Sequence, residues 1–509
     1  MANNMMGADA AQLQLGQRLR ELVERQRSYS VNRISVLTQT DRSSIYQYFD
    51  GKRLPTMNFL RMLVHILRLP EAEVAELFNL YHLARDDAWE MQRDQEILSL
   101  LACARAAMEE DNWHLPLTAP DPAWLESIPT VISSRGMLNQ VLELLVSEEV
   151  ILQEEPMLDF FLSTPELLSV EFLPAILGRC AFPEGKRLAL RQVMEMTRDT
   201  DAKDKDIPGL LAPLKLAVTL YCKARLHCEP FITYVDVPAY RQAGALYPNY
   251  FIFTTAVVQV SPDGTEGLCI RSRETAAAWR QRFTDANRYS ECLEMKATDF
   301  QSALASYSAF TGELEQNMEH YTISFSPVIY PQYTRSILDK YVHAGLPHRE
   351  ELVEGIYQYY HRWESMNQRT VHHVFFTEEG LMQFVREGTS SEIPPALVRT
   401  VEPEDRLALL PDRTEGPWNS YTIINSARLP WPRYLSVCIS FKSLLFTNER
   451  FDGRFNSLAL HDPCLVELFT AFFRRLGQTE YVYPPSVQQE IWESAYDACR
   501  VQSGEPEEE

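Results

Sequence analysis

The chain has 509 residues, 45% hydrophobic and 23% charged, so it is long enough for two to four domains and too apolar to be disordered throughout. Its formal net charge of −22 by itself argues against a nucleic-acid partner. The nine cysteines are scattered without a CxxC pair, which argues against a disulfide framework or a zinc site and favours reduced thiols.

Neither a targeting signal nor a membrane span is expected. The first ten residues lack the basic start and apolar run of a signal peptide. The apolar stretch 210–221 is short and interrupted by Pro and Lys. We expect disorder only at residues 1–11 and in the acidic C-terminal tail, from residue 503. These features predict a cytoplasmic protein.

The first 85 residues predict a bundle of five short helices. Leucines at helical spacing indicate a first helix over 15–26. The later helices are separated by residues that suit helix ends, either as caps or as breaks: Ser30, Asp41, Gly51, Pro55, Thr56 and Pro70.

Basic charge is concentrated in this bundle. Residues 11–70 contain ten Arg or Lys and four Asp or Glu, a net charge of +6, which leaves −28 for the rest of the chain. An acidic body repels DNA, so any DNA contact would be confined to the bundle.

Beyond the bundle, a charged helix over 86–108 and a proline-rich stretch at 114–129 predict a connector. Helical patterning then dominates to about residue 226, including helices over 186–196 and 210–226. From residue 231 the composition changes to aromatic and branched residues, which indicates strands and helices in alternation. The expected strands lie at 231–235, 250–260, 267–271, 321–328, 371–376, 421–424 and 435–446, and the helices at 274–287, 333–343, 348–366 and 378–387.

Two segments of this region resemble each other. Residues 250–288 and 443–476 both predict strand, Asp-Gly turn, strand, a short polar step and an amphipathic helix. The similarity leaves two interpretations open: a duplicated half-domain, or two examples of the common hairpin-then-helix unit.

The segment Asp41 to Pro55, DRSSIYQYFDGKRLP, has Ile45, an aromatic three residues on, then Asp-Gly-Lys and a Pro. With these residues and the first helix, LGQRLRELVERQ, the N-terminal part resembles the helix-turn-helix of the phage Cro/repressor-like (XRE) family. The resemblance implies a bacterial-type transcriptional regulator whose partner is double-stranded DNA. Three positions depart from the family pattern: Gln39 replaces a turn glycine, Val31 a phosphate-holding Gln, and Phe49 a frequent Glu.

Ile45, Tyr48 and Phe49 share one side of the third helix, which we expect to be buried. The start of a recognition helix reaches base edges in the major groove, where Arg42 can grip guanine and Gln47 adenine. The predicted base-reading residues are Arg42, Ser43, Ser44, Tyr46 and Gln47; the resemblance places Arg42, Ser43 and Gln47 on the family's reading positions. The predicted phosphate contacts are Lys52, Arg53, Arg18 and Arg33.

No catalytic pattern is apparent after residue 115, and we expect no enzyme activity, no metal and no cofactor. The sequence contains no phosphate loop, HExxH or GxSxG motif. His372 and His373 would face opposite sides of a strand, Asp462 after His461 suits a helix cap, and Cys222 and Cys228 suit a core. The hairpin-helix units also resemble halves of phospholipase-D-like domains, but the HxKxxxxD motif of active members is absent, which implies sensing or dimerisation.

The sequence therefore predicts a multidomain chain: an all-α helix-turn-helix bundle (12–85), a connector (86–130), a helical region (131–228), an α/β (α+β) body (229–500) and an acidic tail (501–509). The predicted function is sequence-specific DNA binding by a transcriptional regulator. Its body would sense an unknown small-molecule or protein effector and form a homodimer, because one helix-turn-helix offers few contacts. The alternatives are a protein-docking module and an enzyme fused to a DNA-binding domain.

Overall fold

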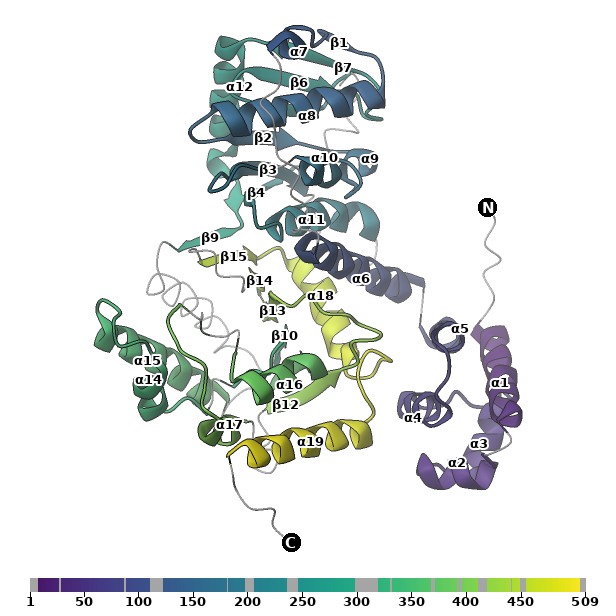
Figure 1. Ribbon diagram of the computed structural model, residues 1–509. Helices are drawn as coiled ribbons and strands as arrows, with labels where there is room; N and C mark the ends of the chain where they lie inside the picture. Colours follow the sequence, from purple (N-terminus) through teal and green to yellow (C-terminus); the bar gives the residue numbers. More distant parts are fainter. Residues whose placement is uncertain are drawn as a thin grey trace.

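A computed structural model describes residues 8–26, 29–86, 88–109, 122–180, 182–196, 206–235, 246–297, 319–329, 332–367, 371–390, 393, 396–410, 419–440, 442–448 and 455–503 (Figure 1). It shows an all-α bundle at the N-terminus beside a long mixed α/β body. The fold class expected from the sequence is therefore confirmed.

The bundle consists of α1 (Ala8–Arg25), α2 (Val31–Leu37), α3 (Arg42–Phe49), α4 (Met57–Leu67) and α5 (Glu71–Arg85). The side chains of Ser30, Asp41 and Thr56 cap α2, α3 and α4 by accepting hydrogen bonds from backbone amides in their first turns. Because α1 begins at Ala8, the expected disorder of residues 8–11 is wrong; residues 1–7 lie outside the described part.

Helix α6 (Ala88–Glu109) follows α5 almost directly and belongs to the body. Its residues Ile97, Leu100 and Ala104 are fully buried in the largest hydrophobic core. It packs against α11 (Ile207–Tyr221) and α18 (Pro463–Leu476), which come from different halves of the body. Most of the expected proline-rich linker lies outside the described residues, and α7 (Pro122–Glu126) follows it.

The first half of the body forms a sheet in the order β1-β7-β6-β5-β2-β3-β4-β8. Strands β2, β3 and β4 are parallel to one another, and all other neighbouring pairs are antiparallel. The strands are β1 (Val131–Ile132), β2 (Met157–Phe161), β3 (Leu188–Met196), β4 (Leu226–Tyr234), β5 (Asn249–Ile252), β6 (Ala256–Val260), β7 (Gly267–Arg271) and β8 (Glu291–Cys292). The helices are α8 (Arg135–Leu152), α9 (Pro165–Leu168), α10 (Leu173–Arg179), α11, α12 (Arg273–Ala286) and the 3-10 helix η4 (Asn287–Tyr289).

The second half forms a sheet in the order β12-β11-β10-β13-β14-β15-β9. Its strands are β9 (Glu294–Ala297), β10 (Glu319–Ser324), β11 (Val371–Thr377), β12 (Asn419–Ile424), β13 (Leu435–Ile439), β14 (Leu444–Asn448) and β15 (Phe455–Leu460). Its helices are α14 (Arg335–Tyr341), α15 (Arg349–Asn367), α16 (Glu378–Glu387), α17 (Pro403–Leu409), α18 and α19 (Pro485–Ser503). The part of the acidic tail after Ser503 lies outside the described residues.

The two halves have the same strand topology. Strands β2, β3 and β4 form a parallel set like β10, β11 and β12. The antiparallel series β5-β6-β7 continues from β2 as β13-β14-β15 continues from β10, and a helix follows each series. The expected hairpin-then-helix repeat is therefore present, and it extends to the whole of each half.

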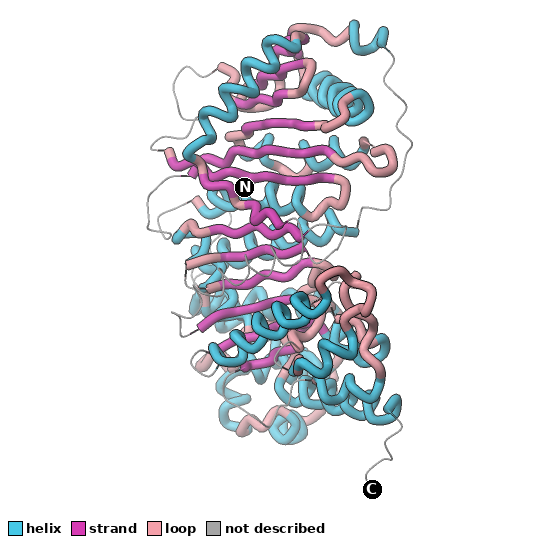
Figure 2. Tube along the Cα trace, turned by 90° about the vertical axis from the view of Figure 1, so that its left-hand side faces the viewer, coloured by secondary structure: helices cyan, strands magenta, loops and turns pink. Residues whose placement is uncertain are grey.

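Leu293 joins the two sheets edge to edge. Its backbone N–H donates to the Pro230 carbonyl in β4 at 2.9 Å, and its carbonyl accepts from the Ala459 N–H in β15 at 2.8 Å. The strand that contains β8 and β9 thus completes the first sheet and begins the second, and Figure 2 shows one continuous column of strands. A single hydrophobic core follows this junction, with members from both halves.

The expected helical region 131–228 is wrong, because β1, β2 and β3 lie within it. Residues 186–196 were expected to be helical and instead form β3, a central strand whose two faces are both covered by helices. Such a strand lacks the simple apolar–polar alternation of an exposed sheet, so its pattern can be mistaken for a buried helix. The expected boundary at 228/229 falls inside β4, and the body divides at Leu293.

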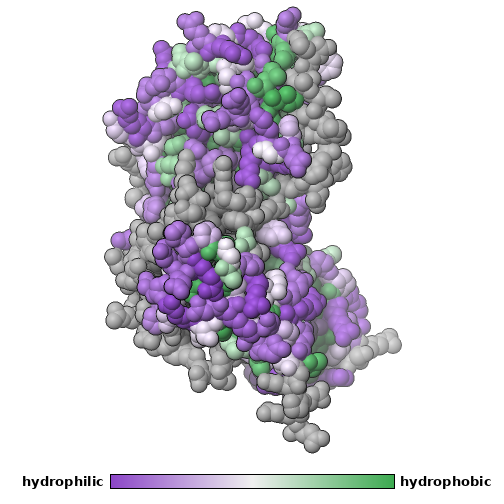
Figure 3. Space-filling view, turned by 60° about the vertical axis from the view of Figure 1, so that its left-hand side comes forward, coloured by the Kyte–Doolittle hydropathy of each residue, from purple (hydrophilic) through white to green (hydrophobic). Residues whose placement is uncertain are grey.

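Most of the surface visible in Figure 3 is hydrophilic, with some hydrophobic side chains gathered near its upper end. Among the described residues, no helix is both long and apolar enough to cross a membrane.

Candidate nucleic-acid interface

Asp41 fixes the start of α3. Its Oδ1 accepts from the Ser44 N–H at 2.8 Å, and its Oδ2 accepts from the Ser44 hydroxyl at 2.6 Å. These hydrogen bonds, the one from the Ser44 side chain first, lower the pKa of Asp41 to about 2. Ser44 is buried, and its hydroxyl is already engaged in this cap. The expectation that Ser44 reads bases is therefore wrong, because both its backbone N–H and its hydroxyl donate to Asp41 in the helix cap.

The other four predicted base-reading residues lie on the exposed side of α3. Arg42, Ser43, Tyr46 and Gln47 are exposed, whereas Ile45, Tyr48 and Phe49 are buried against the bundle core. The Arg42 guanidinium donates to the Asn32 Oδ1 of α2 at 3.0 Å, a surface contact that leaves further donors available. Tyr46 is 54% exposed, which is unusual for a tyrosine and places an amphipathic ring in the predicted reading surface.

Two glycines allow α1 to lie close to α3. A Cβ atom at Gly16 would lie 2.6 Å from the Tyr48 carbonyl oxygen and 2.8 Å from the Gly51 nitrogen. Gly51 adopts φ +65°, as expected for the residue that ends α3, and its carbonyl accepts from the Gln12 Nε2 at 2.8 Å. This close contact fixes α3 relative to α1. Gln39, in the turn before α3, has φ +51°, so the turn keeps a left-handed conformation without its usual glycine.

The two basic residues after α3, which the sequence predicts to contact phosphate, lie at the surface of the bundle. Lys52 and Arg53 are both exposed. The Lys52 ammonium lies 2.8 Å from the Asp50 carboxylate, which also pairs with Arg20 at 2.6 Å. Both cations lower the pKa of Asp50, with the hydrogen bond from Lys52 the largest cause.

The remaining two predicted phosphate residues differ from each other. Arg33 on α2 is exposed and lies 5.2 Å from the centroid of the Tyr29 ring, on the edge next to α3. Arg18 instead points to α5, where it lies 2.9 Å from the Glu76 carboxylate and 3.7 Å from that of Glu73. The expectation for Arg18 is therefore wrong: it shares a face with acidic residues, which repel phosphate.

The bundle docks on the body through α4 and α5, whereas α2 and α3 form its outer, lower end in Figure 1. The Arg61 guanidinium of α4 is buried and donates to the Gly477 carbonyl at 2.9 Å. Burial lowers the pKa of Arg61 to about 10, so this arginine stays charged at neutral pH. On α5, Arg428 of the body lies 3.4 Å from the Glu71 carboxylate and over the Phe78 ring.

His82 and Arg475 form the centre of this contact. The His82 Nδ1 lies 2.7 Å from the Asp86 carboxylate and its Nε2 lies 3.0 Å from that of Glu480. Burial lowers the pKa of His82, but the two carboxylates outweigh it and raise that pKa to about 9. Arg475 at the end of α18 reaches Asp86 at 2.6 Å and Glu90 of α6 at 3.1 Å. The positions of α5, α6 and α18 are thereby tied to one another.

Sequence reasoning did not identify these docking residues. One signal was present: Arg61 interrupts the apolar side of helix four in FLRMLVHIL, where a solvated charge would not be expected. Its partner Gly477 is more than 400 positions away and offers only a backbone carbonyl, which no sequence pattern indicates.

The other residues singled out from the sequence have structural surroundings. His372 is buried and its Nε2 lies 2.9 Å from the Thr322 hydroxyl, while His373 stacks on Tyr321 on the other face. Asp462 caps α18 by accepting from the Leu465 N–H at 2.9 Å. Cys222 and Cys228 are buried thiols.

Comparison with known proteins agrees with the geometry at the N-terminus. The model of a family described as a helix-turn-helix domain matches residues 14–77. The match begins within α1, covers α2, α3 and α4 completely and ends within α5, and so includes the whole exposed side of α3. No curated protein matches the chain. The N-terminal part is therefore a helix-turn-helix domain, and its family suggests DNA as a partner.

Proposed function

We propose that the chain is a sequence-specific transcriptional regulator of the Cro/repressor-like type, which reads double-stranded DNA through α3. The observation that supports this most strongly is that four of the five predicted reading residues are exposed together on a capped helix of a matched helix-turn-helix domain. The local charge of +6 over residues 11–70 favours the same partner.

In this proposal α3 enters the major groove. Arg42 donates to guanine and Gln47 bonds adenine, each contact discriminating against wrong bases by about 1–3 kcal/mol. Tyr46 packs against the groove wall. Lys52, Arg53 and Arg33 contact phosphates on either side, after Lys52 exchanges its contact with Asp50 for a phosphate oxygen.

The body supplies the second part of the proposal, a sensing and dimerising role without catalysis. A dimer would present two reading helices to half-sites about one helical turn apart. The paired halves of the body and the absence of an HxK motif from the sequence favour a non-catalytic relative of the phospholipase-D-like units. DNA occupancy can be coupled to the state of the body because the bundle docks through Arg61 and His82 on Gly477 and Glu480, which directly follow α18.

The test is selection of genomic DNA fragments on the purified full-length protein, sequenced, with binding repeated at two salt concentrations. We expect a palindrome or repeat, and an affinity that falls as salt rises. Arg42→Ala or Gln47→Ala should relax the base preference at one position by about 1–3 kcal/mol, whereas Lys52→Ala should weaken all sequences about equally and flatten the salt slope.

Arg25→Ala is the matched control for Lys52→Ala. It removes the same charge from α1, where Arg25 pairs with Glu73 on the side facing α5, and should leave the affinity and its salt slope close to those of the wild type. If Arg42→Ala leaves the preference unchanged, α3 is not the reading helix. If no fragment is enriched and no affinity depends on salt, the bundle is instead a protein-docking module.

A further inference from the structure

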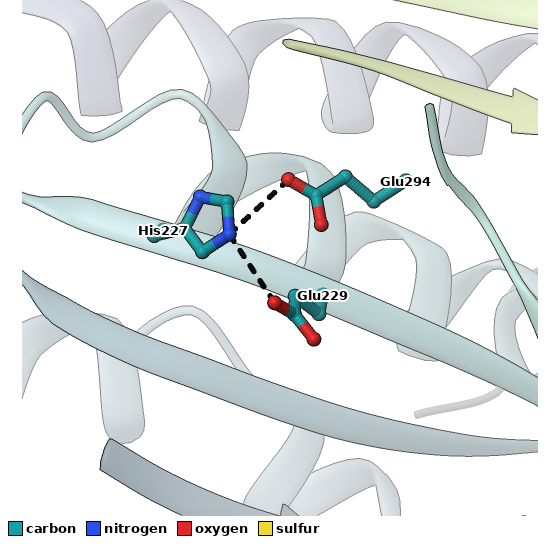
Figure 4. Close-up of side chains that lie close together, drawn as sticks. All are labelled: His227, Glu229 and Glu294. Carbon is teal, nitrogen blue, oxygen red and sulfur yellow. Dashed lines mark hydrogen bonds and ion pairs between the residues drawn. The ribbon is translucent and has the colours of Figure 1, made fainter. Parts of the chain in front are cut away.

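Three metal-ligating side chains converge at the junction of the two halves. His227 and Glu229 lie two residues apart on β4, so both point to the same face, and Glu294 comes from β9 beside them (Figure 4). The His227 Nε2 lies 3.3 Å from a Glu229 carboxylate oxygen and 3.2 Å from one of Glu294. All three ligand atoms lie within 4.8 Å of one another.

These separations suit a shared cation better than an ion pair. A protonated histidine bonded to one carboxylate lies about 2.7–2.9 Å from it, and an N–H shared between two oxygens is aligned well with neither. His82 in this same chain shows the ion-paired arrangement, with each ring nitrogen facing its own carboxylate at 2.7 and 3.0 Å. At His227 both carboxylates face the same nitrogen. Ligands about 2.0–2.2 Å from a tetrahedral ion are separated from each other by roughly 3.3 Å.

The surroundings also favour a bound ion. The side chain of Glu294 is 2% exposed and those of His227 and Glu229 are 16% and 17% exposed, so two carboxylates meet where water screens little of their repulsion. Arg191 lies opposite Glu229 in the register, and its positive charge interacts with this carboxylate as well as with Asp159. Its guanidinium binds the Asp159 carboxylate through two hydrogen bonds of 2.6 and 2.8 Å.

We propose that His227, Glu229 and Glu294 bind one divalent transition-metal ion, which joins β4 of the first half to β9 of the second. An imidazole nitrogen with two carboxylates selects Zn²⁺, Mn²⁺ or Fe²⁺ over Mg²⁺ and Ca²⁺, which prefer oxygen ligands only. The ion lies beside Leu293, the residue through which the backbone hydrogen bonds of both sheets pass. It therefore strengthens the junction between the halves, and this role is independent of DNA binding.

The test uses full-length protein stripped with a chelator and titrated with Zn²⁺, Mn²⁺ and Mg²⁺ by calorimetry and thermal unfolding. We expect one Zn²⁺ or Mn²⁺ per chain and a Tm that rises with the concentration of the ion, because only the folded state binds it. Mg²⁺ should bind at least a hundredfold more weakly. His227→Gln and Glu294→Gln should each abolish the stoichiometric binding and the rise in Tm.

His461→Gln is the matched control, since the His461 Nδ1 lies 3.0 Å from the Glu291 carboxylate near the same junction but outside the proposed ligand set. It should leave binding intact. Circular dichroism and the Tm of the stripped variants identify any that fail to fold, in which case Co²⁺ absorption spectra of the wild type and of Glu229→Gln report ligand loss directly. The proposal is overturned if the stripped wild type binds no transition metal, or if folded His227→Gln and Glu294→Gln bind it as the wild type does.

Discussion

Individual residues of the helix-turn-helix domain are constrained by close backbone contacts as much as by burial. Gly16 is the clearest case, since its hydrogen faces two carbonyl oxygens and one amide nitrogen of the α3 region. A backbone atom cannot move away as a flexible side chain can. A methyl group at this position must therefore push α1 away from α3.

We predict that Gly16→Ala lowers the free energy of unfolding by about 2–3 kcal/mol, because of the overpacking that it causes. Gly136→Ala in α8 is the control, because a Cβ there meets nothing within 4 Å. It should raise stability by up to about 1 kcal/mol through the better helix propensity of alanine. Chemical denaturation of both variants measures the difference; similar stability for the two would contradict the close contact.

A second residue-scale feature is a pair of buried histidines. His320 and His372 stack with ring centroids 4.3 Å apart, at positions equivalent to Leu158 and Leu190 of the first half. Burial lowers the pKa of His320 to about 4 and that of His372 well below its usual value. Both side chains are therefore neutral in the folded protein at pH 7.

We predict an acid-sensitive second half. The unfolded chain takes up a proton at His320 below about pH 6.5, while the folded chain does not until about pH 4. Stability is therefore fully present above pH 6.5 and is lost as the pH falls to 4, by about 3 kcal/mol for His320. His320→Leu, which copies Leu158, should remove this part of the loss in unfolding measurements at pH 7, 5.5 and 4.5. An unchanged pH dependence in the variant would contradict it.

At the scale of elements, the docking of α5 on α18 depends on a protonated histidine. His82 has its pKa raised to about 9 by Asp86 and Glu480, which outweigh the effect of burial. Its stabilising charge is fully present below pH 6.5 and is lost as the pH rises through 9. The docking should weaken over that window, by about 2–3 kcal/mol in total.

Hydrogen exchange of α5 between pH 6.5 and 9.5, corrected for the intrinsic rate, measures this weakening. Glu480→Gln should lower the pH at which α5 loses protection, because it removes one of the two carboxylates that hold the His82 proton. Glu493→Gln, which removes a charge from the exposed side of α19, should leave the profile unchanged. Equal profiles for the two variants would show that His82 does not control the docking.

At the scale of the whole molecule, the elements that depend on residues close together in the sequence could be predicted, whereas those that depend on distant partners could not. The bundle could be predicted because caps such as Asp41 and turn residues such as Gly51 act within a few positions. The hairpin over 256–271 could be predicted for the same reason. Strand β3 could not, since its partners β2 and β4 are distant in sequence and cover it on both edges.

The functional residues likewise divide into those that local sequence could predict and those that it could not. The exposed side of α3 follows from helical periodicity, so Arg42 and Gln47 were placed correctly on it. Ser44 was predicted to read bases, but its hydroxyl donates to the carboxylate of Asp41, three residues earlier, as part of the helix cap. The proposed metal ligands could not be predicted from the sequence, because Glu294 lies 65 positions after Glu229 and the two come close only where the two halves pair. A His-x-Glu pattern on a strand was the one local signal.

The junction at Leu293 also determines the symmetry of the body. Strand β8 runs opposite to β1, and because β9 continues β8, the second half is reversed relative to the first. The halves are thus related by a screw operation, which is a half-turn combined with a shift along the sheet. This operation brings α11 and α18 to the same face of the sheet, where α6 packs against both. Repeating a screw operation produces an open array of copies and never a closed ring. Here the array ends at β1, which has only two residues, and at β12, whose last residue, Ile424, is bridged by Val482; β1 in particular gives a further copy little backbone to pair with.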